Sequence, residues 1–300
     1  MNEDDFPFPE FPILTDEIKT EARRTQSYMP IGFDFFRTTC IASITFACIE
    51  TRSSVWRQIP QIERNVLRGL LSRWCHLGRS MLQLSHDGDS RETVFIISRA
   101  LNETSINIRW CLNEDCKKRF ELFIEAGVQA DLQLRNKILE NIKSRDKELE
   151  IEKRMLKSLD KLAAKSGFTW EKIPPKAKLP DFFQRVKALG DEHLYLAMQR
   201  FPSQSVHGNW SDLVTHYLLE EKGELIPRDK TLRTPDTLYL FPALLQLEAL
   251  MAASKHCLVG EDVQKLFDEY FSKARNDVLA MIQDSAGDDF ISAGTKGDIT

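Results

Sequence analysis

The stretch SRETVFIISRALNETSINIRWCLN, residues 90–113, decides the fold class. Ser90 is a suitable N-cap, and Arg91 and Glu92 follow it in the first turn of a helix. Apolar side chains then recur at three- and four-residue spacing in two stripes. The first stripe comprises Val94, Ile97, Leu101, Thr104, Ile108 and Cys111, and the second comprises Phe95, Ile106 and Trp110. A helix with two apolar faces packs on both sides, so this stretch predicts the interior of a helical bundle.

The segments on either side of this stretch also read as helices. Thr15 is expected to cap a helix that runs to about Tyr28, and Pro60 stands where a long amphipathic helix begins. Further helices are expected at 32–53, 181–189, 191–200, 203–219, 235–257 and 260–284. Lys222 and Gly223 mark the only plausible β-hairpin. Because no strand–helix alternation occurs, we predict an all-α multi-helix bundle with at most one short β-hairpin.

A charged arm is expected at about residues 117–166. Residues 128–165 contain no glycine or proline, and their apolar residues fall on a narrow seven-residue stripe among many charges. This pattern predicts a long exposed helix or a helical hairpin. The arm either packs on the bundle or pairs with a second copy, and a homodimer through it stays open. An irregular loop at 166–180 follows.

Composition and charge limit the class of protein. The chain has 300 residues with 42% hydrophobic and 29% charged residues, which is typical of a globular protein. We expect an extended N-terminal arm (1–14) whose phenylalanines can dock on the body, one helical domain (15–284) and a disordered tail (285–300). A net charge of -4 disfavours non-specific coating of nucleic acid, but a local basic site remains compatible with it.

The cysteines and the most apolar run indicate the compartment. The run CIASITFACI, residues 40–49, is shorter than the roughly 20 residues that cross a bilayer. The six cysteines are scattered without a C-x-x-C pair, and no secretory signal opens the chain. We therefore expect a cytoplasmic protein with free thiols and no membrane attachment.

Arg99 and Glu103 form the first candidate for a functional site. They are four positions apart, so they share one face of the helix between the apolar side chains of Phe95 and Ile106. One interpretation is a structural ion pair. The other is the wall of a site, in which Arg99 binds an anion or phosphate and Glu103 orients it or a nearby imidazole.

The stretch AMQRFPSQSVHGNW, residues 197–210, contains the second candidate. Pro202 is expected to break one helix and Ser203 to cap the next, which puts Arg200 at a helix end and His207 one turn inside the following helix. Arg200 then complements the helix dipole, and His207 is either a core histidine or a reactive group. Gly208 is expected to permit a close helix crossing. Ser203 lies one turn before His207, within hydrogen-bonding reach.

Several classes of site are not supported by any motif. The six histidines form no H-E-x-x-H and no paired E-x-x-H, so no metal is predicted. The chain has no GxxxxGK[ST] or GxGxxG loop, and no cofactor is expected. It also lacks the G-x-S-x-G turn of serine hydrolases.

Two segments together carry a resemblance to a known family. FIISRALNETSINIRWCLN (95–113) and LGDEHLYLAMQRFPSQSVHGNW (189–210) resemble an uncharacterised, mostly bacterial all-α family with an Arg-x-x-x-Glu helix and a later helix with Tyr, Arg, Ser and His-Gly. The resemblance spans about residues 60–220. It implies that Arg99 and Glu103 match the first motif; Tyr195, Arg200, Ser203, His207 and Gly208 match the second. It implies no activity.

A looser resemblance is to HEPN domains, whose metal-independent ribonucleases use an Arg-x(4–6)-His motif. Arg200 and His207 have six residues between them and fit that spacing, although Phe201 and Pro202 depart from the usual motif. This resemblance implies RNA cleavage by a toxin or phage-defence effector. His207 would act as general base or acid on the ribose 2′-OH, and Arg200 would stabilise charge on the scissile phosphate. Arg99, Glu103, Ser203 and Tyr195 would support them.

The alternative is a non-catalytic helical binding or sensor protein. In it Arg99, Glu103 and His207 form a structural buried network, and the arm contacts a protein partner. The two functions differ in what they require of the fold. Convergence of Arg99, Glu103, Arg200 and His207 on one open cleft favours the enzyme, whereas a sealed and hydrogen-bonded His207 favours the binding protein.

Overall fold

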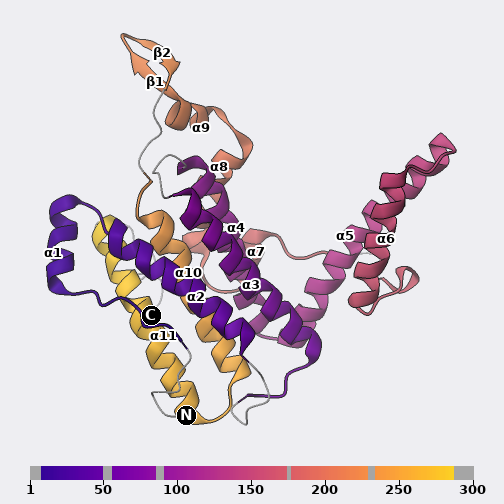
Figure 1. Ribbon diagram of the computed structural model, residues 1–300, viewed down its shortest axis with the longest axis horizontal. Coiled ribbons are helices and arrows are strands. Elements are labelled where there is room, and N and C mark those ends of the chain that lie inside the picture. Colours follow the sequence, from indigo (N-terminus) through magenta and orange to yellow (C-terminus); the bar gives the residue numbers. More distant parts are fainter. Residues whose placement is uncertain (1–7, 50–55, 86–90, 174–176, 229–233, 287–300) are drawn as a thin grey trace, which may run out of the picture.

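Five long helices make the core of the protein (Figure 1). A computed structural model describes residues 8–49, 56–85, 91–173, 177–228 and 234–286. The core helices are α2 (Met29–Cys48), α3 (Gln61–Leu84), α4 (Arg91–Leu112), α10 (Thr237–Cys257) and α11 (Glu261–Ala286). Helix α10 packs against α11, α4 and α2, while α3 packs against α2 and α4. The predicted all-α class with one short hairpin is confirmed.

Helix α10 is central because apolar residues surround it. Its side chains Leu240, Leu245, Leu247 and Leu250 are fully buried. Fully buried Gln246 is a polar exception: its Nε2 donates to Ser43 Oγ of α2 at 3.0 Å, and its Oε1 accepts from Ser105 Oγ of α4 at 2.8 Å. One amide therefore joins three core helices with both ends hydrogen-bonded.

Helices α2 and α10 are long and apolar enough to cross a membrane, judged by length and composition alone. In this fold 56% of the apolar window of α2 and 72% of that of α10 are buried inside the protein. Packing in the core accounts for their composition. The absence of membrane attachment stays a prediction.

The N-terminal region packs on the core as the sequence indicated. Helix α1 (Asp16–Thr25) begins where Thr15 Oγ1 accepts from the Ile18 amide at 3.4 Å. It ends before the predicted Tyr28, and α2 begins at Met29, because Pro30 is tolerated in a first helical turn. Phe8 packs edge-on against Phe267 with ring centroids 5.3 Å apart, so the arm docks. Residues 1–7 lie outside the described part.

The predicted arm is a helical hairpin that projects from the core (Figure 1). It consists of α5 (Cys116–Arg145) and α6 (Glu150–Lys165), and Asp146 begins the turn with a left-handed φ of 53°. The hairpin alternative is therefore confirmed. Its inner face buries Val128, Ile138 and Leu159. Its outer surfaces expose the large apolar side chains Leu134, Leu139, Leu149, Ile151, Met155 and Leu162.

Short helical segments connect the hairpin arm to α10. They are the 3-10 helices η2 (Trp170–Lys172) and η3 (Glu192–Leu194), the π-helices η4 (Leu196–Arg200) and η5 (Leu213–Tyr217), and α7 (Phe182–Lys187), α8 (Phe201–His207) and α9 (Trp210–Asp212). The predicted continuous helix at 203–219 is wrong. Pro202 lies in the first turn of α8, where proline is tolerated, and the helix ends at His207, before Gly208 with its left-handed φ.

The predicted β-hairpin is confirmed. Strands β1 (Leu218–Glu221) and β2 (Glu224–Pro227) pair antiparallel, with Glu221 opposite Glu224. The two turn residues have φ values of 53° at Lys222 and 84° at Gly223, which match the turn type that suits the twist of hairpin strands. Helices α10 and α11 agree with the ranges expected for them. Most of the predicted tail, residues 287–300, lies outside the described part.

Candidate functional site

One face of α4 carries the first predicted motif, and the connecting segments run along that face in the opposite direction. Arg185 of α7 meets the C-terminal half of α4, Gln199 of η4 meets its middle, and His216 of η5 meets its N-terminal end at Phe95. Helices α8 and α4 also pack on each other. The fold therefore brings the two predicted motifs together.

Glu103 pairs with Arg185 and not with Arg99. Nη2 of Arg185 lies 3.0 Å from Glu103 Oε1, and Nη1 of Arg185 donates to Asn107 Oδ1 one turn further along α4. The guanidinium also lies over the Phe182 ring, 5.7 Å from its centroid. Arg185 is only 5% exposed, so these contacts replace the water it has lost. The ion pair expected between Arg99 and Glu103 is therefore not formed among the described residues, because Glu103 pairs with Arg185 of another segment.

Arg99 contacts the π-helix that ends at Arg200. With the Gln199 amide oxygen facing α4, that oxygen accepts from Nη2 and Nε of Arg99 at 2.8 and 3.3 Å. Close by, buried Asn102 donates from Nδ2 to the Met198 carbonyl at 3.4 Å. Arg99 thus fixes η4 on α4.

Tyr195 and Ser203 have structural contacts. Tyr195 is half-buried and meets Phe183 edge-on, with ring centroids 5.1 Å apart. Ser203 lies inside α8 and donates from Oγ to the Gln199 carbonyl. The expectation that Ser203 caps a helix is therefore wrong. Its hydroxyl bonds to the preceding turn, and its reach to His207 stays a prediction.

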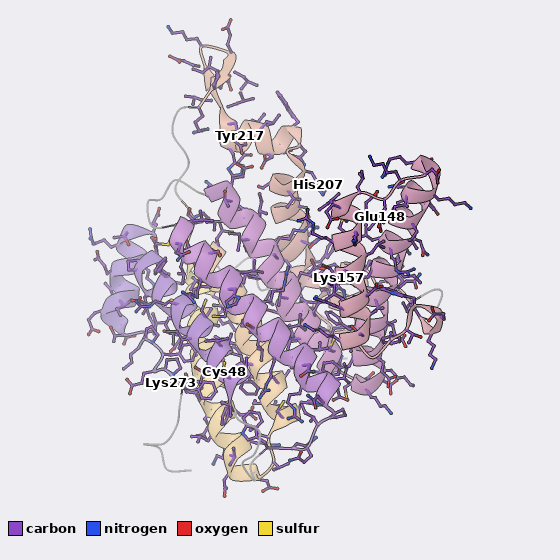
Figure 2. The ribbon with its side chains drawn as sticks, turned by 45° about the vertical axis from the view of Figure 1, so that its right-hand side comes forward. Cys48, Glu148, Lys157, His207, Tyr217 and Lys273 are labelled. Atoms are coloured by element: carbon purple, nitrogen blue, oxygen red, sulfur yellow. The ribbon has the colours of Figure 1, made fainter. Side chains whose placement is uncertain are left out.

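His207 is exposed at the C-terminal end of α8 (Figure 2). Among the described residues, no hydrogen bond or ion pair joins it to Arg99 or Glu103. Gly208 follows with a left-handed φ of 56°, and a Cβ built there meets nothing within 4 Å. The expected close helix crossing at Gly208 is wrong, because this glycine serves backbone conformation instead. The side chain of Arg200 lies outside the described residues.

A second polar cluster lies where the N-terminal end of α4 meets η5 and the base of the β-hairpin. Asp212 is 1% exposed, and neither of its oxygens accepts a hydrogen bond from the residues described here. His216 Nε2 stands 3.8 Å from Asp212 Oδ1, too far for a hydrogen bond. The cluster also includes Arg91 and Arg228, whose charges act on His216. Its last member is Glu92, on which the charge of Asp212 acts. A buried carboxylate without donors costs about 1–3 kcal/mol or more, so this cluster calls for an explanation.

The pKa values in this cluster shift in the directions that burial dictates. Burial lowers the pKa of His216, the Asp212 charge opposes this, and the charges of Arg91 and Arg228 lower it further. Burial, with help from the Asp212 charge, raises the pKa of Glu92. The neutral form of the His216 imidazole is therefore favoured, and this form can accept a hydrogen bond.

Sequence reasoning missed this cluster for a physical reason. Asp212 and His216 are four residues apart in SDLVTH at 211–216, a spacing that by itself indicates only that the two side chains share one face of a helix. Arg91 and Arg228 come from segments that only the fold brings together. Within the described ranges, no group of three or more His, Cys, Asp or Glu side chains is arranged to hold a metal ion.

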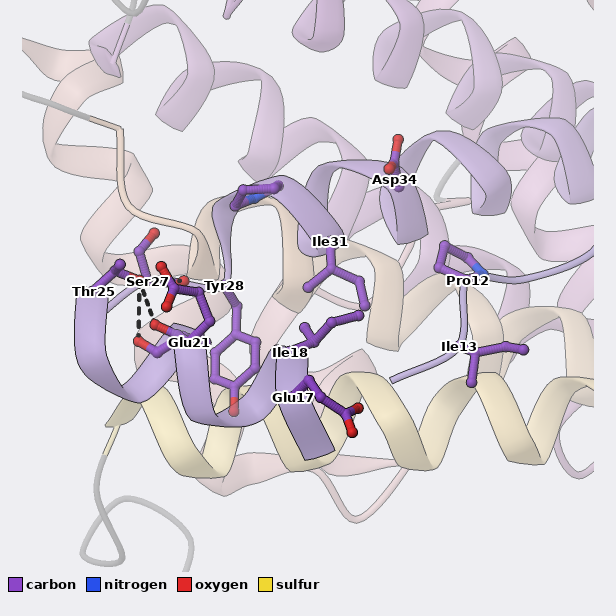
Figure 3. A pocket seen from close by; sticks show the side chains of 12 residues that line it. Pro12, Ile13, Glu17, Ile18, Glu21, Thr25, Ser27, Tyr28, Ile31 and Asp34 are labelled. Atoms are coloured by element: carbon purple, nitrogen blue, oxygen red, sulfur yellow. Dashed lines mark hydrogen bonds between the residues drawn. The ribbon is translucent and has the colours of Figure 1, made fainter. Parts of the chain in front are cut away.

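A groove of about 650 Å³ lies elsewhere, beside α1 and the start of α2 (Figure 3). Ile18, Tyr28 and Ile31 are among its apolar walls, and Glu17 and Asp34 stand at its rim. It is lined by none of the six predicted site residues. The predicted residues therefore do not share this groove.

The comparisons with known proteins assign the chain to a family. A family model described as a family of unknown function, DUF5677, matches residues 64–225. The matched range runs from α3 to β2 and includes both motifs, as expected from a resemblance over about residues 60–220. No curated protein and no solved structure matched the chain. The family match shows no link to HEPN domains. Because it extends over more than half of the chain, the protein belongs to the DUF5677 family.

Proposed function

We propose that the protein is a metal-independent ribonuclease effector of the toxin or phage-defence type. The observation that carries this proposal is the exposure of His207 at the end of α8. An exposed imidazole can meet a polynucleotide from solution, whereas a sealed one cannot. Its neighbour in the motif, Arg200, closes the π-helix η4, and π-helical turns are frequent at functional sites.

The supporting residues act by position. Arg99 holds η4 through Gln199, and Asn102 holds it through the Met198 carbonyl. Glu103 holds α7 through Arg185. Arg99 and Glu103 are thus positioning residues that fix the segment leading to Arg200 and His207 on a rigid core helix.

The proposed reaction needs only groups that the chain and RNA supply. The imidazole of His207 takes the proton of a ribose 2′-OH, and the resulting oxygen attacks the adjacent phosphorus. The bond from phosphorus to the 5′-oxygen breaks, and this oxygen takes up the proton that His207 holds, which returns the imidazole to its starting state. The products are a 2′,3′-cyclic phosphate and a 5′-hydroxyl. The Arg200 guanidinium would stabilise the charge that develops on the phosphate.

The test compares wild type with His207→Ala on total RNA in the presence of EDTA. We expect cleavage by wild type and a loss of at least about 100-fold in the variant, the usual contribution of a general base. His76→Ala, at an exposed histidine on α3, is the matched control and should cleave as wild type does. Growth inhibition on expression should follow the same order.

Thermal unfolding followed by circular dichroism shows whether each variant is folded. A wild-type protein that leaves RNA intact contradicts the proposal. So does a folded His207→Ala variant that cleaves RNA at the wild-type rate.

A second function is favoured by the hairpin arm, namely partner binding without catalysis. The arm leaves Leu134, Ile151 and Leu162 about half exposed, at 45%, 54% and 48%. Apolar side chains on a projecting element are typical of an interface. The mixed charges of the arm suit a second copy of the chain, so we propose a homodimer through α5 and α6.

Sedimentation velocity over a range of concentrations tests the homodimer. Wild type is expected to sediment as a dimer and Ile151→Asp as a monomer. Lys153→Asp, on the same helix and also exposed, is the matched control and should leave the dimer intact. A monomeric wild type at every concentration contradicts the proposal.

A further inference from the structure

The cluster at Asp212 contains unmet hydrogen-bonding groups of both kinds. Asp212 is 1% exposed, and its two carboxylate oxygens accept no hydrogen bond from the described residues. Nε of Arg91 and Nε of Arg228 are buried, and each lacks an acceptor within the described ranges. Oppositely charged groups so close in space normally pair with one another. Within the described ranges, the ionic contact made by Asp212 is the one to His216, whose Nε2 lies 3.8 Å from Asp212 Oδ1.

The two arginines are held in place by the fold. Arg91 lies over the Phe95 ring, with Cζ 5.7 Å from the centroid. Arg228 donates from Nη2 to the Leu218 carbonyl at 3.0 Å, which fixes it at the base of the β-hairpin. The Arg228 amide also donates to the Tyr217 carbonyl at 2.7 Å, next to His216, and the His216 ring contacts the same Phe95 ring as Arg91. Two neighbouring, oriented guanidinium groups suit an anionic oxygen ligand such as phosphate.

His216 lies beside Asp212 and contacts the same Phe95 ring as Arg91. Its ring meets Phe95 edge-on at 5.9 Å between centroids, and the side chain belongs to the π-helix η5. Tyr217 follows it at the base of the hairpin (Figure 2). Burial and the two arginines favour the neutral form of the imidazole, as described above. A ligand that fits this cluster therefore offers anionic acceptors to the arginines and a hydrogen-bond donor to Asp212 and His216.

We propose that Arg91, Asp212, His216 and Arg228 form a binding site for a ribose phosphate unit of RNA. The phosphate oxygens accept from the two arginines, and the neighbouring 2′-hydroxyl donates to Asp212 or His216. The hydroxyl that distinguishes RNA from DNA is thus read by a buried carboxylate. The choice of RNA as the source of this unit rests on the ribonuclease function proposed above.

The test uses mononucleotides, so that it does not depend on cleavage. Uridine 3′-monophosphate carries the hydroxyl beside the phosphate, and 2′-deoxyuridine 3′-monophosphate lacks it. Binding is measured by calorimetry and by the His216 ring signals in NMR spectra. The ribonucleotide is expected to bind at least about tenfold more tightly than the deoxynucleotide, because the latter leaves Asp212 unpaired.

Substitutions assign the binding to this site. Arg91→Gln and Arg228→Gln should each weaken uridine 3′-monophosphate binding by at least about tenfold, since each removes a charged hydrogen bond to phosphate. Asp212→Asn should abolish the preference for the ribonucleotide. Arg79→Gln, at an exposed arginine on α3, is the matched control and should bind as wild type does. The comparison of the two nucleotides in wild type needs no variant, so a misfolded variant does not remove the test.

The two proposals fail in different ways. Equal binding of the two nucleotides and of inorganic phosphate, or undiminished binding in Arg91→Gln and Arg228→Gln, overturns the site even where RNA cleavage depends on His207. Selective uridine 3′-monophosphate binding by a protein that cleaves no RNA supports the site and overturns the ribonuclease function.

Discussion

Buried polar side chains join segments of this chain that are far apart in sequence. Gln246 links α10 to Ser43 and Ser105, and Arg185 links α7 to Glu103. Each residue is surrounded by apolar neighbours, so each contact also selects one packing of the helices over its alternatives. Helical periodicity predicted the faces on which these residues lie. It did not predict their partners, because these come from other segments.

Substitution of Gln246 tests how much one such link contributes. Gln246→Met keeps the side-chain volume but removes both hydrogen bonds, and we expect it to lower the free energy of unfolding by about 1–3 kcal/mol. Urea denaturation measures the change. Ser43 and Ser105 keep their hydrogen bonds to the carbonyls of Thr39 and Leu101 in this variant, so the loss should stay within this range. Gln83→Met, at an exposed position on α3, should have almost no effect.

At the scale of elements, the close approach of α2 and α3 depends on Gly78. A Cβ at this position would lie 2.5 Å from Cys40 Sγ, well inside van der Waals contact. Gly69 lies on the same helix with nothing within 4 Å of a Cβ among the described residues. The sequence shows two glycines in one helix, and only the packing distinguishes their roles.

The two glycines are therefore predicted to respond in opposite directions to alanine. Gly78→Ala should lower the free energy of unfolding by about 1–3 kcal/mol through overpacking. Gly69→Ala should raise it by about 0.5–1 kcal/mol, because alanine loses less backbone entropy in a helix. Thermal and urea unfolding of both variants give the comparison. A Gly78→Ala protein as stable as wild type would contradict the crossing geometry.

The turn of the hairpin arm is predicted to be sensitive to acid. Hydrogen bonds from Arg145 and from the Leu149 amide lower the pKa of Glu152 to about 2. Because the folded pKa lies below the ordinary value, this contact stabilises the turn fully above that value. The stabilisation is lost as the pH falls towards 2. The protection factors of the amides near residues 146–149, which are corrected for the slower intrinsic exchange at low pH, should therefore fall on acidification in wild type.

Glu152→Gln is the control for the acid response. Its turn should exchange faster at neutral pH and respond less to acidification over the same range. Identical pH profiles for wild type and variant would show that another group is responsible.

At the scale of the whole molecule, the part of the chain that matches the family model, here called the family region, does not contain the whole core. Residues 64–225 contain α3 and α4 but lack α2, α10 and α11. Ile106 of α4 packs in one cluster with Leu245 of α10, and Leu101 of α4 packs in another with Tyr239 and Ala243. Residues from both apolar stripes of α4 are therefore covered by segments outside the family region.

A fragment comprising residues 64–225 is accordingly predicted not to fold by itself. It should bind a hydrophobic dye such as ANS and show no cooperative unfolding transition, because α4 exposes the face that α10 covers. A fragment comprising residues 8–286, which keeps all described helices, should unfold at the same urea concentration as the full chain. A cooperative transition in the shorter fragment would contradict this prediction.

The sequence by itself determined the helical class, the hairpin arm, the β-hairpin and the face of α4 on which Arg99 and Glu103 lie. These features are local, since hydrophobic periodicity, caps and turn residues act within one or two helical turns. It did not determine that the helix ends before Gly208, because Pro202 was an equally good local signal for a helix break. Only the tertiary structure decided that Glu103 pairs with Arg185, and that Arg91 and Arg228 join Asp212 and His216. Such charge clusters depend on which distant segments pack against α4, and no local pattern encodes that choice.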